Sequence, residues 1–150
     1  RNGIAMDLTT DHKPNNPSER ERIEQLGGEV EWCGEVDRRG NPLLDTGVYR
    51  INGNLAVSRA LGDRSEYPFI SATPDVRVLP IVSKYDEFVV LASDGLYDVM
   101  SSQEVVSFLH NCIANFKGRF TQRDTLAKLL TEEAIRRGSM DNVSVIIIWL

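Results

Sequence analysis

Phe88-Val89-Val90-Leu91-Ala92-Ser93-Asp94-Gly95 is an apolar run that ends in an acidic turn, and Asp141-Asn142-Val143-Ser144-Val145-Ile146-Ile147-Ile148-Trp149-Leu150 is an apolar run that begins with one. Both runs are rich in β-branched residues and have about the length of a buried strand. If the two strands pair antiparallel, the end of the first lies beside the start of the second. The pattern therefore predicts that the carboxylates of Asp94 and Asp141 converge at one edge of a sheet.

Two interpretations of this pair are open. Paired carboxylates beside a tight glycine turn are typical of a site for a hard, oxygen-preferring cation such as Mg²⁺ or Mn²⁺. Asp-Gly and Asp-Asn are also ordinary turn dipeptides at the ends of strands. On these residues alone, the second interpretation is favoured.

The composition is that of an ordinary globular chain. Its 150 residues suit one domain that buries roughly two-thirds of its unfolded surface. The net charge is −5, and the Lys and Arg residues are scattered, which argues against nucleic acid or an anionic membrane as a main partner. Cys33 and Cys112 do not indicate a disulfide framework, so we expect an intracellular location, cytoplasmic or nuclear. No membrane span and no signal peptide are visible.

Alternation and turn signals predict six or seven strands. The predicted strands cover residues 4–9, 29–32, 48–51, 55–58, 76–80, 87–93 and 143–150. Asn52-Gly53 lies between two of them and fits a type I′ hairpin turn, in which both central residues need positive φ. Residues 33–46 are polar and glycine-containing, and we expect an exposed excursion there.

Three helices are predicted, over residues 17–26, 101–112 and 121–137. Their start signals are Asn16 before Pro17, the Ser101/Glu104 capping box, and Thr121 with Asp124. Their stop signals include Gly27 and Gly138. The apolar faces predicted to enter the core are Val105, Val106, Phe108 and Leu109, and then Leu126, Leu129, Leu130, Ala134 and Ile135. Helices that are segregated from strands indicate an α+β layered fold.

Five blocks of the sequence resemble, in order, those of the metal-dependent serine/threonine protein phosphatases of type 2C. The blocks are Thr10-Asp11-His12-Lys13-Pro14; Glu19-Arg20-Glu21-Arg22-Ile23 with Gly27-Gly28; Asn54-Leu55-Ala56-Val57-Ser58-Arg59-Ala60-Leu61-Gly62-Asp63; Ala92-Ser93-Asp94-Gly95-Leu96-Tyr97-Asp98-Val99-Met100; and Gly138-Ser139-Met140-Asp141-Asn142-Val143-Ser144-Val145. Each block is weak evidence alone, but together they span almost the whole chain. The resemblance makes the metal-binding interpretation of Asp94 and Asp141 the favoured one.

The resemblance implies an α-β-β-α sandwich of two antiparallel sheets flanked by helices. It also implies hydrolysis of phosphoserine and phosphothreonine in phosphoproteins. Two Mg²⁺ or Mn²⁺ ions, with a third and weaker position, would activate the attacking water, so that no side chain acts as nucleophile. Asp94 and Asp141 would ligate one ion, and Asp98 would belong to the third position. The alternative for Asp98 is an aspartate at a helix N-terminus, stabilised by the helix dipole.

Residues 31–63 resemble the flap region of this family, which borders the substrate site, and Ser58, Arg59 and Asp63 lie in its best-matching block. A structural ion pair of Arg59 with Asp63 or another neighbour is the favoured alternative to a substrate contact. The excursion before this block is either a determinant of substrate choice or a solvated loop. His12 and His110 lack His or Cys partners at ligand spacing, so structural roles are expected for both.

The family's early motifs, which supply the bridging carboxylate and the phosphate-binding Arg, do not occur in residues 1–150. We therefore expect the chain to be the C-terminal part of a type 2C catalytic domain that needs the N-terminal half. Alone, it should bind metal weakly and hydrolyse phosphoesters poorly. The alternative function is a non-catalytic pseudophosphatase, an interaction module that binds partners through the flap surface.

Overall fold

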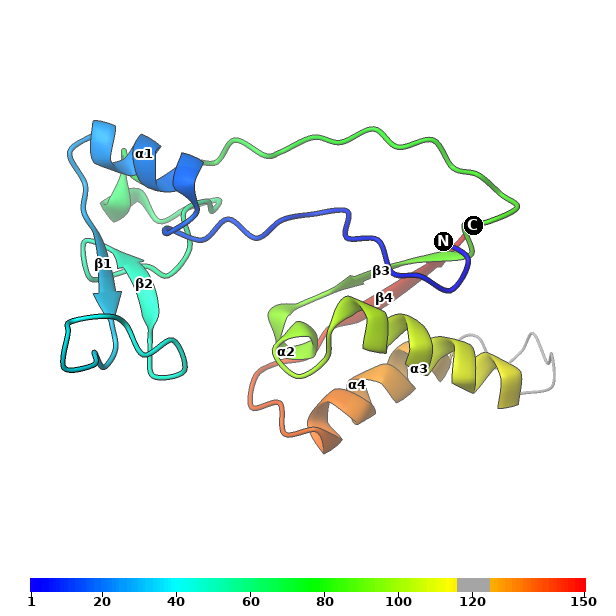
Figure 1. Ribbon diagram of the computed structural model, residues 1–150. Helices are drawn as coiled ribbons and strands as arrows, with labels where there is room; N and C mark the ends of the chain where they lie inside the picture. Colours follow the sequence, from blue (N-terminus) through cyan, green and yellow to red (C-terminus); the bar gives the residue numbers. More distant parts are fainter. Residues whose placement is uncertain (116–124) are drawn as a thin grey trace. The chain divides into compact units, whose positions relative to one another are not determined.

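The two acidic runs form neighbouring antiparallel strands in the computed structural model, which describes residues 1–115 and 125–150 (Figure 1). Strand β3 (Phe88–Ala92) pairs with β4 (Val145–Trp149), in a register that places Ala92 opposite Val145 and Phe88 opposite Trp149. The end of β3 therefore lies beside the start of β4, as the sequence predicts. This register brings the Asp94 turn next to the Asp141 turn.

The chain divides into two compact units, and each is described by itself. Unit 1 comprises Arg1–Leu8 and Val78–Leu150, and unit 2 comprises Thr9–Arg77. Asp94, Asp98 and Asp141 belong to unit 1. Ser58, Arg59 and Asp63 belong to unit 2.

Helices cover one face of the β3–β4 sheet in unit 1. They are α2 (Asp94–Tyr97), α3 (Ser102–Asn115) and α4 (Leu126–Arg136). Among the described residues of this unit, the fully or almost fully buried core consists of Leu96, Met100, Val105, Leu109, Leu126, Leu130 and Ala134. Side chains on one face of the strands, such as Val90 and Ile147, pack against it, whereas Leu91 and Ile146 on the other face are more than half exposed. Packing against the helices thus fixes the strands that carry the acidic turns.

The capping box at the start of α3 is confirmed. The Ser101 backbone N–H donates to Glu104 Oε2 at 2.9 Å, and the Glu104 N–H donates to Ser101 Oγ at 3.3 Å. The predicted start signals of the next helix, Thr121 and Asp124, lie outside the described residues. Gly138 follows α4 with φ of +96°, as the predicted stop requires.

One predicted core residue of α4 is wrong. Ile135 is 60% exposed, whereas Leu126, Leu130 and Ala134 are fully buried. The buried positions repeat every four residues and follow one face of the helix. The side chain of Ile135 lies about 100° around the helix from Ala134, outside that face.

Unit 2 contains helix α1 (Pro17–Gln25), strands β1 (Val30–Cys33) and β2 (Val48–Ile51), and the 3-10 turn η1 (Arg64–Glu66). The strands pair antiparallel, with Val30 opposite Ile51. Their apolar side chains join α1 in a small core of Ile23, Val30, Ile51 and Ile70. This core holds the loops on which Ser58 and Arg59 lie.

The predicted Asn52-Gly53 turn is present, but the strand expected after it is not. Asn52 and Gly53 have φ of +48° and +72°, and the Asn54 N–H donates to the Ile51 carbonyl at 2.8 Å. Pairing beyond the turn is limited to one bridge between Ile51 and Leu55. The chain leaves the sheet there, so the predicted strand over 55–58 does not form.

The predicted strands over 4–9 and 76–80 are also absent from the described residues, in which four strands form rather than six or seven. Val76 and Val78 are 80% and 92% exposed. Alternation of apolar residues favours a strand, but the strand also needs a neighbour that accepts and donates backbone hydrogen bonds. Helices with two small antiparallel sheets still confirm the α+β class.

Within residues 1–115 and 125–150, the structure contains no helix of the length and apolarity that a membrane span requires.

Candidate metal centre

The serine before Asp94 ties the ends of β3 and β4 together. Ser93 Oγ donates to the Asn142 carbonyl at 2.9 Å and accepts from the Ser144 N–H at 3.0 Å. The Ser93 N–H also donates to the Ser144 carbonyl at 3.0 Å. The side chain therefore extends the ladder by one step and fixes the spacing of the two acidic turns.

Gly95 is required at this point because the opposite backbone approaches closely. A Cβ atom on Gly95 would lie 2.6 Å from the Asn142 carbonyl oxygen, closer than carbon and oxygen can approach. On the other side, Ser139 Oγ donates to the Gly95 carbonyl at 2.6 Å. These roles of Ser93 and Ser139 were not predicted from the sequence. The signal available was a serine near the start of each acidic turn: Ser93 directly precedes Asp94, and Ser139 lies two residues before Asp141.

Both carboxylates are exposed and held by their own turns. Asp94 Oδ1 accepts from the Gly95 N–H at 3.1 Å, and Asp141 Oδ1 accepts from the Asn142 N–H at 2.6 Å. Within the described part of the chain, neither carboxylate forms an ion pair with Lys, Arg or His. Two uncompensated carboxylates at adjacent strand ends are donors of the kind that Mg²⁺ and Mn²⁺ prefer. The residues present therefore fit part of the ligand shell of such an ion.

Asp98 lies at the C-terminal end of α2, where its N–H donates to the Asp94 carbonyl at 2.8 Å. The alternative that placed it at a helix N-terminus is therefore wrong, because α3 begins only at Ser102. Among the described residues, no three His, Cys, Asp or Glu side chains gather closely enough to hold a metal ion. The third metal position remains a prediction.

Arg59 is engaged in a network within unit 2. Its guanidinium donates to Glu19 Oε1 at 2.6 Å, to Asp75 Oδ1 at 2.8 Å and to the Thr73 carbonyl at 2.9 Å. Glu19 and Asp75 raise the pKa of Arg59 further above its ordinary value, against the effect of desolvation. The favoured alternative, a structural ion pair, is present, but its partners are Glu19 and Asp75 rather than Asp63.

Glu19 is the buried centre of this network. Only 3% of the residue is exposed, and Arg22 donates to its Oε2 at 3.0 Å. Burial alone would raise the pKa of Glu19, but the hydrogen bonds from Arg59 and Arg22 outweigh it and lower the pKa to about 2. Arg22 also donates to the carbonyls of Phe69 and Ser58. Helix α1 is thereby fastened to the chain around residues 58–75.

Ser58 and Asp63 differ in burial. Ser58 is fully buried, and its Oγ makes no hydrogen bond of regular geometry in the described residues, although the hydroxyl contributes to lowering the pKa of Glu19. Asp63 is exposed, has φ of +46° and precedes η1. A substrate role for Ser58, Arg59 or Asp63 remains a prediction.

Both histidines contact single carboxylates. His12 Nε2 lies 2.9 Å from Asp75 Oδ2, and His110 Nε2 lies 3.2 Å from Glu87 Oε2. The His110 ring also packs edge-on against Phe88, with ring centroids 5.7 Å apart. These contacts agree with the structural roles expected for both.

The sequence and the structure were compared with those of known proteins. The family model described as Protein phosphatase 2C matches residues 1–143.

The chain belongs to the protein phosphatase 2C family.

Relatives in this family differ in how much of their length the chain spans. "Probable protein phosphatase 2C 8" of Oryza sativa subsp. japonica is 40% identical over 161 residues, which cover the whole chain but 36% of that protein. "Probable protein phosphatase 2C 30" of Arabidopsis thaliana is 40% identical, and 35% of it is covered. The chain thus spans about a third of these plant relatives. By contrast, it covers 86% of the "PP2C-like domain-containing protein R307" of Acanthamoeba polyphaga mimivirus, at 35% identity.

Two solved structures share the fold. A C. elegans sex determining protein aligns with a TM-score of 0.83 and 32% identity, over 99% of this chain and 33% of its own. A phosphatase of Toxoplasma gondii aligns with a TM-score of 0.78 and 31% identity, over 97% of this chain and 42% of its own. The chain therefore shares its fold with one part of each of these two longer structures.

We predict that Glu19→Gln destabilises the protein strongly and that Glu24→Gln does not. Glutamine leaves Arg22 and Arg59 without the charge that compensates them, which costs about 3 kcal/mol for a buried pair. Glu24, on the same helix, pairs with Arg20 at 2.7 Å, but both side chains are about half exposed, so its loss costs about 0.5 kcal/mol. Urea unfolding of the full-length protein, monitored by circular dichroism, measures the free energy of unfolding of both variants.

The effect of pH on this stability difference follows from the lowered pKa of Glu19. A carboxyl group whose pKa is lower in the folded than in the unfolded protein stabilises the fold above its unfolded pKa. The advantage of wild type over Glu19→Gln should therefore be full above pH 4.5 and shrink as the pH falls towards about 2. Equal losses of stability in the Glu19→Gln and Glu24→Gln variants would contradict the role of the Glu19 network. So would a stability difference between wild type and Glu19→Gln that does not change with pH.

Proposed function

We propose that the protein containing this chain hydrolyses phosphoserine and phosphothreonine esters in phosphoproteins and requires Mg²⁺ or Mn²⁺. The observation that supports this most directly is the uncompensated pair of Asp94 and Asp141 at adjacent strand ends, in a member of the protein phosphatase 2C family. Two ions, when bound, would neutralise phosphoryl oxygens and lower the pKa of the attacking water. Asp98 would belong to a third and weaker position that shares Asp94.

The chain's own contribution is to position oxygen donors. The Ser93 hydroxyl joins the two strand ends, and Gly95 allows the Asn142 backbone to lie against the Asp94 turn. Each carboxylate is oriented by one backbone N–H through Oδ1. A second carboxylate oxygen on each side chain could face a cation. Positions fixed by backbone geometry lose little conformational freedom when an ion binds.

The remaining ligands would come from the other half of the catalytic domain. Two or three carboxylates are too few for the octahedral shell that Mg²⁺ demands. Residues 1–150 alone should therefore bind metal weakly and turn over little phosphoester. A reducing location, cytoplasmic or nuclear, is also proposed, because Cys33 and Cys112 are both free thiols.

A non-catalytic interaction module is the second candidate function. The specific observation in its favour is that the chain covers 86% of the mimivirus relative, against 36% of the rice relative. A protein of that extent would have room for little besides this half of the domain. It would then act through its exposed surface rather than through catalysis.

The experiment that separates the two candidates is an assay of the full-length protein on a phosphothreonine peptide, with Mn²⁺ and with EDTA. We expect turnover with Mn²⁺ and its loss in EDTA, with recovery when Mn²⁺ is added in excess. Activity that survives EDTA would contradict the metal requirement. A folded protein that is inactive under all conditions would favour the interaction module.

We further predict that Asp94→Asn and Asp141→Asn each reduce kcat/KM of the full-length protein by at least about 100-fold and leave its Tm almost unchanged. Asparagine keeps an oxygen that can accept from Gly95 or Asn142, so the turns persist, but it removes the charge that holds the cation. Asp98→Asn should reduce kcat/KM less, and raised Mn²⁺ should restore part of the loss. The measurement is kcat/KM over a Mn²⁺ series, with thermal melts of each variant.

The order of the three variants in kcat/KM decides the assignment of the metal positions. If Asp98→Asn proves the most damaging, the assignment of the metal positions is wrong. Near-normal turnover of Asp94→Asn would exclude that carboxylate as a ligand.

A further inference from the structure

The loop between β1 and β2, residues 34–47, has a closed neck and is named here the arginine loop. The backbones of Gly34 and Gly47 touch, so that a Cβ on Gly34 would lie 2.7 Å from Gly47 Cα. Trp32 holds the neck in place. Its Nε1 donates to the Glu35 carbonyl at 2.8 Å, and its ring packs edge-on against Tyr49, with ring centroids 5.2 Å apart. The base of the loop is therefore fixed to the sheet.

The tip of the arginine loop is fixed by Asp37. Its Oδ1 accepts from the backbone N–H groups of Arg39 and Asn41 at 2.8 and 2.9 Å. Its Oδ2 accepts from the Asn41 side chain at 3.0 Å. The hydrogen bonds from Asn41, with those from the backbone, lower the pKa of Asp37 below its ordinary value. The carboxylate is thus directed at its own turn.

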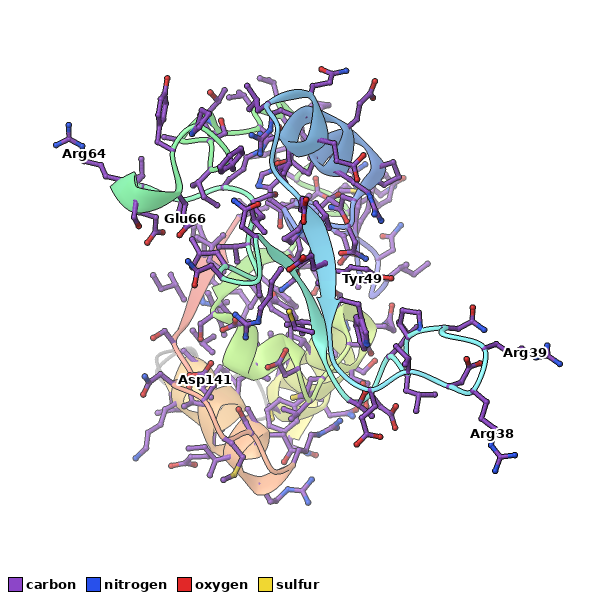
Figure 2. The ribbon with its side chains drawn as sticks, turned by 90° about the vertical axis from the view of Figure 1, so that its left-hand side faces the viewer. Arg38, Arg39, Tyr49, Arg64, Glu66 and Asp141 are labelled. Atoms are coloured by element: carbon purple, nitrogen blue, oxygen red, sulfur yellow. The ribbon has the colours of Figure 1, made fainter. Side chains whose placement is uncertain are left out.

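Arg38 and Arg39 lie side by side at this tip, on a loop that also carries Glu35 and Asp45 close to its neck. Both arginines are exposed, and within residues 1–115 and 125–150 neither forms an ion pair. Figure 2 shows both side chains extending away from the strands. Elsewhere in unit 2, Arg22 and Arg59 are held by Glu19. Arg64 and Arg77 of the same unit are also exposed and form no ion pair in the described residues, but they are far apart in the sequence. Arg38 and Arg39 are adjacent, so their positive charges are concentrated at the tip of one ordered loop.

Apolar side chains flank the two arginines on the same loop. Val36 is 53% exposed, and Leu43 and Leu44 are 39% and 76% exposed. Exposed apolar side chains next to arginines suit a recognition surface, because Arg is enriched at protein interfaces and the apolar side chains can be buried there. Because the loop is ordered by its own hydrogen bonds, a partner would pay little entropy to bind it.

We propose that the arginine loop is a docking surface for an acidic segment of the phosphoprotein substrate, separate in sequence from its phosphorylated residue. Arg38 and Arg39 would pair with Asp or Glu carboxylates, which a guanidinium binds in a two-pronged geometry. Val36 and Leu44 would cover an apolar side chain beside them. The proposal rests on the proposed phosphatase function for the identity of the occupant, but not for the binding itself.

The test compares two phosphothreonine peptides on the full-length protein. One carries four Asp or Glu residues and a Leu on one side of the phosphothreonine, and the other carries Ser in their place. The variant Arg38→Glu/Arg39→Glu reverses the charge of the tip. Its matched control is Arg64→Glu/Arg77→Glu, which changes the net charge equally at two other exposed arginines of unit 2 that form no ion pair in the described residues. Arg64 extends outward from η1, away from the arginine loop (Figure 2).

We expect wild type to prefer the acidic peptide by about 5- to 10-fold in kcat/KM, through KM rather than kcat. Exposed ion pairs contribute modestly, so the preference should fall as salt is raised from about 0.05 to 0.3 M. The Arg38→Glu/Arg39→Glu variant should lose the preference, and the Arg64→Glu/Arg77→Glu control should keep it. Arg38→Gln/Arg39→Gln, which removes charge without adding any, should lie between wild type and the reversed variant.

A second readout does not depend on catalysis. Fluorescence anisotropy of the acidic peptide without phosphate measures docking alone, and the reversed variant should bind it at least about 5-fold more weakly than the control. The proposal is overturned if wild type shows neither preference nor binding, or if the control loses as much as the Arg38/Arg39 variant. A protein that dephosphorylates neither peptide would refute the proposed function, and anisotropy would then still decide whether the loop binds acidic segments.

Discussion

The antiparallel pairing of β3 with β4 is the constraint on which the candidate site depends. A one-residue shift of this register would move the Asp94 turn away from the Asp141 turn and would turn the apolar side chains of the strand to the opposite face. Ser93 opposes such a shift, because its hydroxyl both donates and accepts across the strand ends. Helices α3 and α4 oppose it too, because their buried faces pack against the side of the sheet that carries Val90 and Ile147. The same strand register therefore satisfies the packing of the core and the placement of the two acidic turns.

Unit 2 is organised around a charge rather than around apolar contacts alone. Its hydrophobic core is small, and the buried carboxylate of Glu19 joins α1 to two arginines whose other hydrogen bonds reach the carbonyls of Ser58, Phe69 and Thr73. A buried carboxylate is stable only when it is paired, and this pairing orders chain segments that have no strand or helix to hold them. The arginine loop shows the converse arrangement: Asp37 satisfies its own turn, so Arg38 and Arg39 remain available to a partner.

Sequence reasoning succeeded mainly where the determinant is local and failed mainly where it is distant. The Asn52-Gly53 turn and the Ser101 cap follow from φ preference and a three-residue spacing. The antiparallel pairing that places the Asp94 turn beside the Asp141 turn is a distant contact, and it could be predicted because both apolar runs have the length and composition of a strand. The ion pair of Arg59 could not be read in this way, because Glu19 is 40 residues away whereas Asp63 is only four residues along the chain. The strands expected over 4–9 and 76–80 had the right alternation, but a sequence pattern does not reveal whether a neighbouring strand is present. The metal assignment of Asp94 depends on the protein phosphatase 2C family as well as on geometry.

The most direct test of the account locates the ion itself. Mn²⁺ broadens the NMR signals of nearby nuclei, so amide spectra of the full-length protein can be recorded as substoichiometric Mn²⁺ is added. The account predicts that the amides of Gly95 and Asn142, which donate to the two carboxylates, broaden first and together. Mg²⁺ in excess should reverse the effect. Broadening centred on other residues, with Gly95 and Asn142 unaffected, would contradict the claim that the β3–β4 strand ends hold the metal.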